Sequence, residues 1–301
     1  MKKIVIKKNH AINIWVLMMI LCLFTVFGCS NQSTDIHSSD KVQIQQSKEE
    51  TTTKTENLEN KNIDLTNDFK NINGCAVIFT PHDNQYLFYN EDMCKQRVSP
   101  YSTFKIISTL IGLRNGVIDD ETSVMNYNGT KYPVADWNSN LSLQEAFQSS
   151  CIWYFRQIID SVGEDEVKNE LNHLIYGNCD ISEWNGSSIN SIKELNGFWL
   201  DSSLKISPLE QIQVLSRIFE GQSIYDAEDV DVLQNIMLVE NIGAKKIYGK
   251  TGSGTNGEAW FIGFSEENSQ KVYFVIYLSD ASQPKGVSGT TAKEIALEII
   301  K

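Results

Sequence analysis

The chain has 301 residues, of which 41% are hydrophobic and 10% aromatic, so it is long enough for one large globular domain or two small ones. Its formal net charge of −12 argues against nucleic acid as a partner, because such a surface repels a phosphate backbone. Only four histidines are present, and neither a C-x-x-C nor an H-E-x-x-H spacing occurs, so we expect chemistry that uses no metal.

The first 29 residues have the layout of an export signal. Lysines precede an uncharged apolar run over residues 11–27. The sequence Val26-Phe27-Gly28-Cys29 resembles a bacterial lipobox, and this resemblance implies that Cys29 is lipidated as the first residue of the mature protein. An uncleaved membrane helix is the alternative anchor. Both alternatives predict an exported protein held at the outer face of the cell membrane, with partial secretion as a further outcome.

Residues 30–66 are rich in Ser, Thr, Gln, Asn, Glu and Lys, with few large apolar side chains. Such a segment cannot bury enough apolar surface to offset its ordering entropy, so we predict a disordered polar tether. The catalytic domain is then expected over residues 67–301. Export permits disulfides without requiring them. Cys75 and Cys94 could therefore form a disulfide bridge or remain two free thiols.

Apolar patterning predicts strands at both ends of this domain and helices between them. The runs Cys75–Phe79 and Tyr86–Tyr89 are typical of a β-hairpin whose turn contains His82. Residues 115 to about 245 have mostly helical periodicity. This order predicts an α+β fold with a central antiparallel sheet from N- and C-terminal strands, flanked by helices and with a mostly helical middle region. The C-terminal elements are expected as strands over 246–251, 259–264 and 272–278 and an amphipathic helix over 291–300.

Ser102-Thr103-Phe104-Lys105 begins an apolar helical stretch over residues 104–113. At a spacing of three residues, the serine and the lysine lie on the same helix face. A serine hydroxyl becomes a good nucleophile when a base takes its proton, and a lysine amine can do so only when it is neutral. Apolar burial can lower a lysine pKa by about 3–5 units. The same pattern also fits a helix N-cap beside a solvated lysine, so the other motifs decide between the two interpretations.

Lys250-Thr251-Gly252 lies on a predicted strand and is followed by Ser253. Lys250 and Thr251 can face an anionic substrate, and the glycine allows the substrate backbone to approach closely. The backbone N–H of Ser253 can pair with that of Ser102 to form an oxyanion hole.

Three further motifs lie between these two. Ser150 opens a helical run and can pass a proton to a leaving nitrogen, although it also fits a helix N-cap. Taken together, the motifs resemble those of the class D (OXA-type) serine β-lactamases in order and spacing. The resemblance covers residues 70–301. The motifs that carry it are Ser102-Thr103-Phe104-Lys105, Ser150-Cys151-Ile152, Tyr176-Gly177-Asn178, Phe198-Trp199-Leu200 and Lys250-Thr251-Gly252.

The resemblance implies a sheet-plus-helices fold shared with penicillin-binding proteins. It also implies hydrolysis of β-lactam antibiotics, penicillins first, through an acyl-enzyme on Ser102. Lys105 would be carboxylated by carbon dioxide or bicarbonate to N6-carboxylysine, the general base for acylation and deacylation. Trp199 would hold this carbamate through its indole N–H, and Ser150 would pass a proton to the leaving nitrogen. No other cofactor is implied.

The resemblance also assigns residues that surround the reacting groups. Ile152 and Leu200 would form an apolar wall, and Tyr176 would contact the substrate. The chain departs from the family in having Ile152 where valine is usual. It also has no arginine after Arg217 to bind the drug carboxylate, and Lys285 is the candidate replacement.

Other functions compete with this interpretation. The penicillin-sensing domain of BlaR/MecR receptors shares most of the motifs but acylates without turnover. Resemblance to the sensors would require asparagine at position 152, where a polar amide helps to expel the carbamate. A cell-wall transpeptidase or carboxypeptidase would not need Trp199, and a purely adhesive lipoprotein would need none of the motifs. The enzyme is therefore the favoured interpretation, with the sensor as the alternative.

Overall fold

The computed structural model describes residues 59–284 and 286–301. The predicted leader with Cys29, and the part of the tether up to residue 58, lie outside the described residues. Within the described ranges, none of the helices combines the length and the apolar character needed to cross a membrane.

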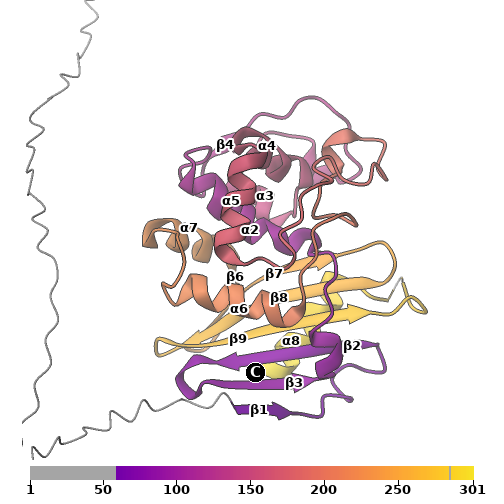
Figure 1. Cartoon of the computed structure of the whole chain (residues 1–301), viewed down its shortest axis with the longest axis vertical. Helices are drawn as coiled ribbons and strands as arrows, with labels where there is room; N and C mark the ends of the chain where they lie inside the picture. The colour runs from indigo at the N-terminus through magenta and orange to yellow at the C-terminus, as the bar shows by residue number, and fades with distance from the viewer. Residues whose placement is uncertain (1–58, 285) are drawn as a thin grey trace, which may run out of the picture. The chain divides into compact units, whose positions relative to one another are not determined.

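A seven-stranded sheet, in the order β1-β3-β2-β9-β8-β7-β6, forms the framework of the described unit (Figure 1). Neighbouring strands run antiparallel except β1 and β3, which are parallel. N-terminal and C-terminal strands share this sheet, which confirms the predicted α+β fold. The strands of the sheet are β1 (Glu59–Asn62), β2 (Gly74–Thr80), β3 (Gln85–Tyr89), β6 (Leu238–Ile242), β7 (Lys245–Ser253), β8 (Glu258–Glu267) and β9 (Gln270–Ser279), and a separate pair consists of β4 (Val124–Met125) and β5 (Leu141–Ser142).

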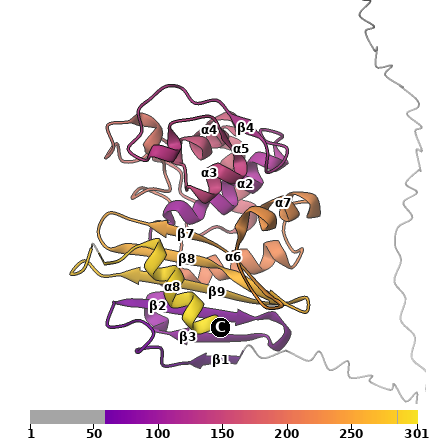
Figure 2. The same cartoon turned by 180° about the vertical axis from the view of Figure 1, so that it is seen from behind.

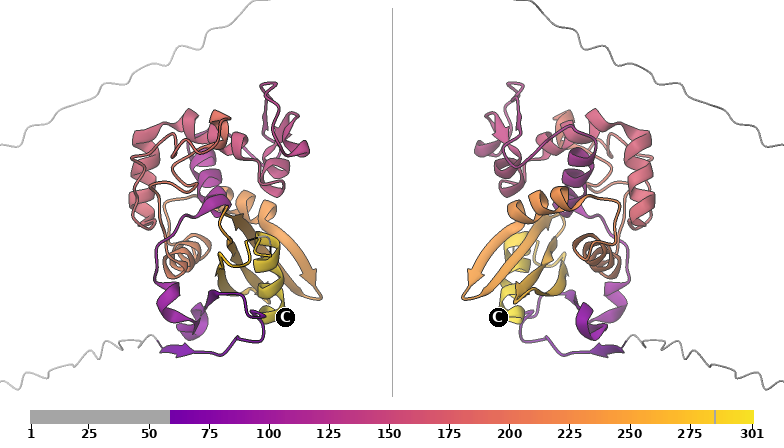
Figure 3. Two further views of the ribbon diagram at one scale, coloured as in Figure 1. Left: turned by 90° about the vertical axis from the view of Figure 1, so that its right-hand side faces the viewer. Right: turned by 90° about the vertical axis from the view of Figure 1, so that its left-hand side faces the viewer.

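Helices cover both faces of this sheet, with α8 on one face and α6 on the other (Figures 2 and 3). On β8, Trp260 and Ile262 belong to the core on the α6 side, whereas Ala259 and Phe261 belong to the core under α8. Because both faces are buried, the central strands have nearly continuous apolar sequences. The helices are α1 (Glu91–Cys94), α2 (Lys105–Arg114), α3 (Leu143–Gln148), α4 (Ile152–Val162), α5 (Glu164–Leu174), α6 (Pro208–Phe219), α7 (Ala227–Met237) and α8 (Gly289–Ile300).

Helices α2 to α5 lie together beyond the β7 side of the sheet (Figures 1 and 2). Helix α2 is buried at every position from Lys105 to Leu113, which places it inside this helical group. The 3-10 turn η2 (Tyr101–Phe104) leads into α2 and packs against β7. The start of α2 and strand β7, which are far apart in the sequence, therefore meet at one place.

The structure corrects one expectation and answers one question that the sequence left open. Strand β1 pairs with β3, and the N–H of Ile63 donates to Phe88 O at 2.8 Å, so the tether does not extend to residue 66 and the folded unit begins before residue 67. The middle region holds helices α3 to α7, as predicted, together with the short strands β4, β5 and β6. Cys75 and Cys94 are free buried thiols, and the Cys94 thiol donates to Ala76 O at 3.3 Å.

Candidate active site

Ser102 lies on the turn η2, and Lys105 is the first residue of α2. The Lys105 Nζ is 2.9 Å from Ser102 Oγ, as the three-residue spacing predicts. The lysine side chain is 1% exposed, and its Nζ lies 5.5 Å from the centre of the Phe155 ring. Burial, with a smaller contribution from the charge of Lys250, lowers the pKa of Lys105 well below its usual range. A neutral amine therefore lies beside the serine hydroxyl, in position to accept its proton.

A second buried lysine projects from β7 toward Ser150. The Lys250 Nζ donates to Ser150 Oγ at 3.0 Å and to Thr251 O at 3.1 Å. Burial lowers the pKa of Lys250 to about 7. Ser150 has a φ of 57°, in the left-handed region that few residues other than glycine adopt, so its backbone is strained. The pairing places Lys250, a proton donor whose pKa is near neutral pH, next to Ser150, the serine predicted to relay a proton.

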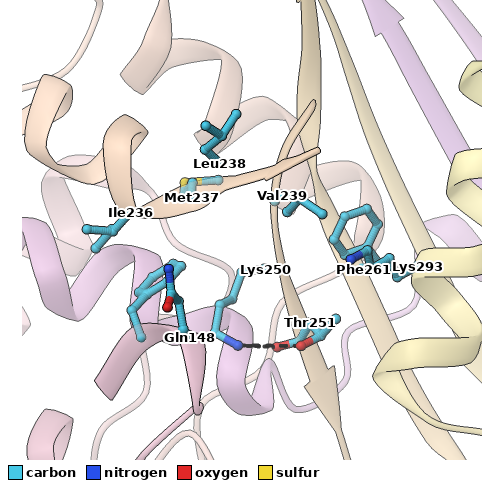
Figure 4. A pocket seen from close by; sticks show the side chains of 11 residues that line it. Gln148, Ile236, Met237, Leu238, Val239, Lys250, Thr251, Phe261 and Lys293 are labelled. Carbon is cyan, nitrogen blue, oxygen red and sulfur yellow. Dashed lines mark hydrogen bonds between the residues drawn. The ribbon is translucent and has the colours of Figure 1, made fainter. Parts of the chain in front are cut away.

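A cavity of about 260 Å³ opens beside Lys250. Figure 4 shows Lys250 and Gln148 next to each other at this cavity, with Ile236, Met237 and neighbouring side chains along its wall. Lys293 of α8 lines the same cavity. Lys293 was not among the predicted cations for a substrate carboxylate, and Lys285, the predicted one, lies outside the described residues.

The edge of β7 that faces the helices is open near the site. Strand β6 pairs with β7 only as far as Tyr248, so from Gly249 to Ser253 this edge has no partner strand in the described chain. Exposed backbone groups on a strand edge can bind an extended substrate or an oxyanion. The Ser253 hydroxyl accepts the N–H of Gly289 at 2.9 Å and so faces α8, which leaves the backbone of Ser253 as its predicted contribution to the site.

Gly252 allows a close contact that differs from the one predicted for it. A Cβ at this position would lie 3.2 Å from Thr103 Cγ2 and 3.3 Å from Pro100 O. The glycine therefore lets β7 pack closely against the turn that carries Ser102, and the approach of a substrate at this position stays a prediction.

Trp199 lies in the loop beside the nucleophile turn, with its ring 5.4 Å from the ring of Phe104. Its Nε1 is the one buried side-chain nitrogen or oxygen that has no hydrogen-bond partner among the described residues. Such a group has a large desolvation cost unless a partner binds it. A carbamate oxygen is one kind of acceptor that this N–H could bind. Ile152 and Leu200 line an adjacent cavity of about 190 Å³, as expected for an apolar wall.

Tyr176 was predicted to contact the substrate, but its side chain lies in the interior. Its side chain is 0% exposed, its ring packs against Phe104, and its hydroxyl lies 3.5 Å from Gln211 Oε1. Gln211 in turn donates to Thr103 Oγ1 at 2.9 Å. Tyr176 therefore supports the nucleophile turn from behind.

The predicted catalytic residues thus come together, and two aromatic rings complete their surroundings. Phe155 faces Lys105, and Phe147 lies 5.5 Å from the Lys250 Nζ. Neither ring was predicted from the sequence, although both lie on helices that flank Ser150. Across the described residues, no group of three or more His, Cys, Asp or Glu side chains is placed to hold a metal ion.

Comparison with known proteins identifies relatives over most of the chain. Residues 49–301 match the penicillin binding protein transpeptidase domain. The chain is 33% identical over 247 residues to the probable beta-lactamase YbxI of Bacillus subtilis, a match that covers 81% of this chain and 85% of that protein. It is 32% identical over 231 residues to the regulatory protein BlaR1 of Bacillus licheniformis, covering 75% of this chain but only 36% of that protein.

The fold is also similar to that of a solved structure from these relatives. The crystal structure of a class D beta-lactamase from Bacillus subtilis superimposes with a TM-score of 0.71 at 32% identity, covering 79% of this chain and 94% of that one.

Proposed function

Because the chain belongs to the family of class D serine β-lactamases, we propose that it hydrolyses β-lactam antibiotics, penicillins first, through an acyl-enzyme on Ser102. The observation that carries this proposal is the 2.9 Å contact between Ser102 Oγ and the fully buried Lys105 Nζ. A lysine desolvated in this way is an effective base only because it is neutral, and this is the state that the pocket favours.

In acylation, Ser102 Oγ attacks the lactam carbonyl carbon and gives its proton to the base at position 105. The backbone N–H groups of Ser102 and Ser253 stabilise the developing oxyanion. The ring C–N bond then breaks, and Ser150 passes its proton to the departing nitrogen. Lys250, with its pKa of about 7 and its Nζ 3.0 Å from Ser150 Oγ, replaces that proton. Deacylation repeats the base step with water as the nucleophile.

Carboxylation of Lys105 is part of the proposal. The neutral amine forms an N–C bond to carbon dioxide and releases a proton, giving N6-carboxylysine, whose oxygen then serves as the general base. The unpartnered indole N–H of Trp199 supports this modification. The apolar side chains of Ile152 and Leu200 limit the water and polar groups that would promote its loss. No metal cofactor is proposed.

Export and anchoring belong to the same proposal, through a lipid on Cys29 or an uncleaved N-terminal helix. Either anchor places the enzyme on the outer face of the membrane, where β-lactams arrive.

The alternative function is a β-lactam sensor of the BlaR/MecR type, which acylates without turnover. The similarity to BlaR1 of Bacillus licheniformis supports this alternative. Position 152 favours the enzyme, because isoleucine cannot compete for the lysine amine as a polar amide can.

A steady-state assay of the full chain with penicillin, with and without added bicarbonate, tests the proposal. We expect many turnovers per molecule and an increase in rate with bicarbonate, whereas Ser102→Ala should be inactive. One stoichiometric burst of product would instead establish the sensor. Turnover that does not respond to bicarbonate would reject the carbamate but retain the serine mechanism.

A further inference from the structure

Tyr101, the residue before the nucleophile, has an unusual backbone. Its φ is 49°, in the left-handed region, and its side chain is 2% exposed. A bulky aromatic residue adopts this conformation only where its surroundings impose it, and such outliers concentrate at functional sites. The contacts of Tyr101 therefore show what the strained turn is holding.

Tyr101 binds the loop of Trp199 at two points. Its backbone N–H donates to Trp199 O at 3.1 Å, and its hydroxyl hydrogen-bonds the carboxylate of Asp201. Between these two points lies Leu200, which lines the cavity beside the site. The orientation of the segment that carries the indole and the apolar wall is thus tied to the residue next to Ser102.

The same hydroxyl also contacts the hairpin formed by β7 and β8. It hydrogen-bonds Glu258, the first residue of β8, whose backbone O accepts the N–H of Gly254 at 2.8 Å. This bond closes the connection that directly follows Ser253. The tyrosine ring also packs on Gly254, where a Cβ would lie 2.5 Å from the ring. The hairpin that supplies the predicted oxyanion N–H therefore rests on Tyr101.

We propose that Tyr101 is a positioning residue that sets the spacing of the Trp199 segment and the Ser253 hairpin around Ser102. This inference rests on the proposed function, since it concerns how that reaction is organised. Removing the hydroxyl breaks its hydrogen bonds to the Trp199 segment and to the Ser253 hairpin at once, while the ring continues to fill its space. Errors of about 1 Å in such positioning can cost about 100-fold in rate.

The first test compares Tyr101→Phe with Tyr225→Phe in the full chain. Tyr225 is also buried and also donates to a carboxylate, Glu170, at 2.7 Å, in a network between α2 and α5. We expect Tyr101→Phe to slow deacylation of a penicilloyl-enzyme by about 10- to 100-fold and to raise the bicarbonate concentration needed for half-maximal rate. Tyr225→Phe should change both quantities by less than about twofold, even if both variants melt at lower temperatures.

The second test uses Asp201. In Asp201→Asn, the amide can still hydrogen-bond the phenol oxygen, so deacylation should stay within about threefold of the parent. Asp201→Ala should instead behave like Tyr101→Phe. Parent turnover with unchanged rates in Tyr101→Phe overturns this inference alone, and a parent that shows no turnover overturns the proposed function with it.

Discussion

Two buried amines, Lys105 and Lys250, determine the chemistry of individual residues in this site. Each amine touches a serine hydroxyl and faces an aromatic ring, so each lies where a charge is poorly solvated. Burial lowers the pKa of Lys105 well below its usual range and that of Lys250 to about 7, and the two roles separate because Lys105 contacts Ser102 whereas Lys250 contacts Ser150. The first suits a base or an amine that captures carbon dioxide, and the second suits a proton donor.

Trp199→Phe tests the assigned role of the indole N–H while retaining an aromatic ring against Phe104. We expect deacylation to slow by about 10-fold or more and acylation to change less, because loss of the hydrogen bond weakens retention of the carbamate. Rapid-mixing kinetics with a penicillin would measure both steps. Trp184→Phe is the control, since its Nε1 donates to Asp160 at 3.2 Å on the outer side of Phe198. Equal losses in both steps would remove the role from Trp199.

At the scale of elements, the turn Tyr176-Gly177-Asn178 packs closely against a distant segment of the chain. Gly177 has a φ of 57°, and a Cβ there would lie 2.0 Å from Lys205 O. The side chain of Asn178 accepts the N–H of Lys205 at 2.9 Å and donates to Ser203 O at 2.8 Å. The motif therefore fixes the chain segment that follows the Trp199 loop.

Gly177→Ala should destabilise the protein by about 2–4 kcal/mol, because it combines backbone strain with a backbone clash. Gly221→Ala is the matched control. Gly221 has a φ of 69°, but a Cβ there would meet no atom within 4 Å beyond its chain neighbours, so only about 1–2 kcal/mol should be lost. Urea unfolding of both variants measures the difference. Similar losses would show that the clash with Lys205 is relieved at no cost.

Removing strand β1 tests where the folded domain begins. It pairs with β3, and Ile63 and Leu65 pack against the core under α8. A chain that begins at Asn67 should therefore melt below the full chain, by an amount equivalent to about 1–3 kcal/mol for the lost main-chain bonds and apolar contacts. A chain that begins at Glu59 should retain the stability of the full chain. Identical melting temperatures for the two truncations would restore the predicted boundary at residue 67.

At the scale of the whole molecule, the site depends on segments more than 100 residues apart. Ser102 lies on the turn η2 and Lys105 begins α2, whereas Lys250 and Ser253 lie on β7. Folding must therefore bury both lysines together, and this affects the stability of the entire fold.

The free energy of unfolding should rise with pH above about 7. The pKa of Lys250 is about 7 in the folded chain and 10.5 ordinarily, so between these values the unfolded chain binds more protons than the folded chain. Each pH unit in that window should add about 1.4 kcal/mol, and Lys105 acts in the same direction. Urea unfolding between about pH 6.5 and 8.5 in buffer without carbon dioxide measures the slope. Lys250→Met should reduce the slope to the part that Lys105 contributes, and a slope parallel to that of the parent would contradict the shift of Lys250.

Local patterns in the sequence were sufficient for much of this protein. The spacing of Ser102 and Lys105 places them on one helix face in any fold, and the apolar runs of β2, β7, β8 and β9 predict strands because their periodicity is local. The order of the motifs was sufficient to identify the family. These features depend on neighbours within a few residues, which a sequence displays directly.

Tertiary packing alone decided the rest. Tyr176 faces inward rather than toward the substrate because Gln211 and Phe104 surround it. Tyr101 meets Asp201 and Glu258 across separations of 100 and 157 residues, which no local pattern encodes. Strand β1 is short and polar, so it is a strand only because β3 offers it an edge. In each case the deciding partner is distant in the chain, and the free energy of contact belongs to the pair and not to either sequence segment.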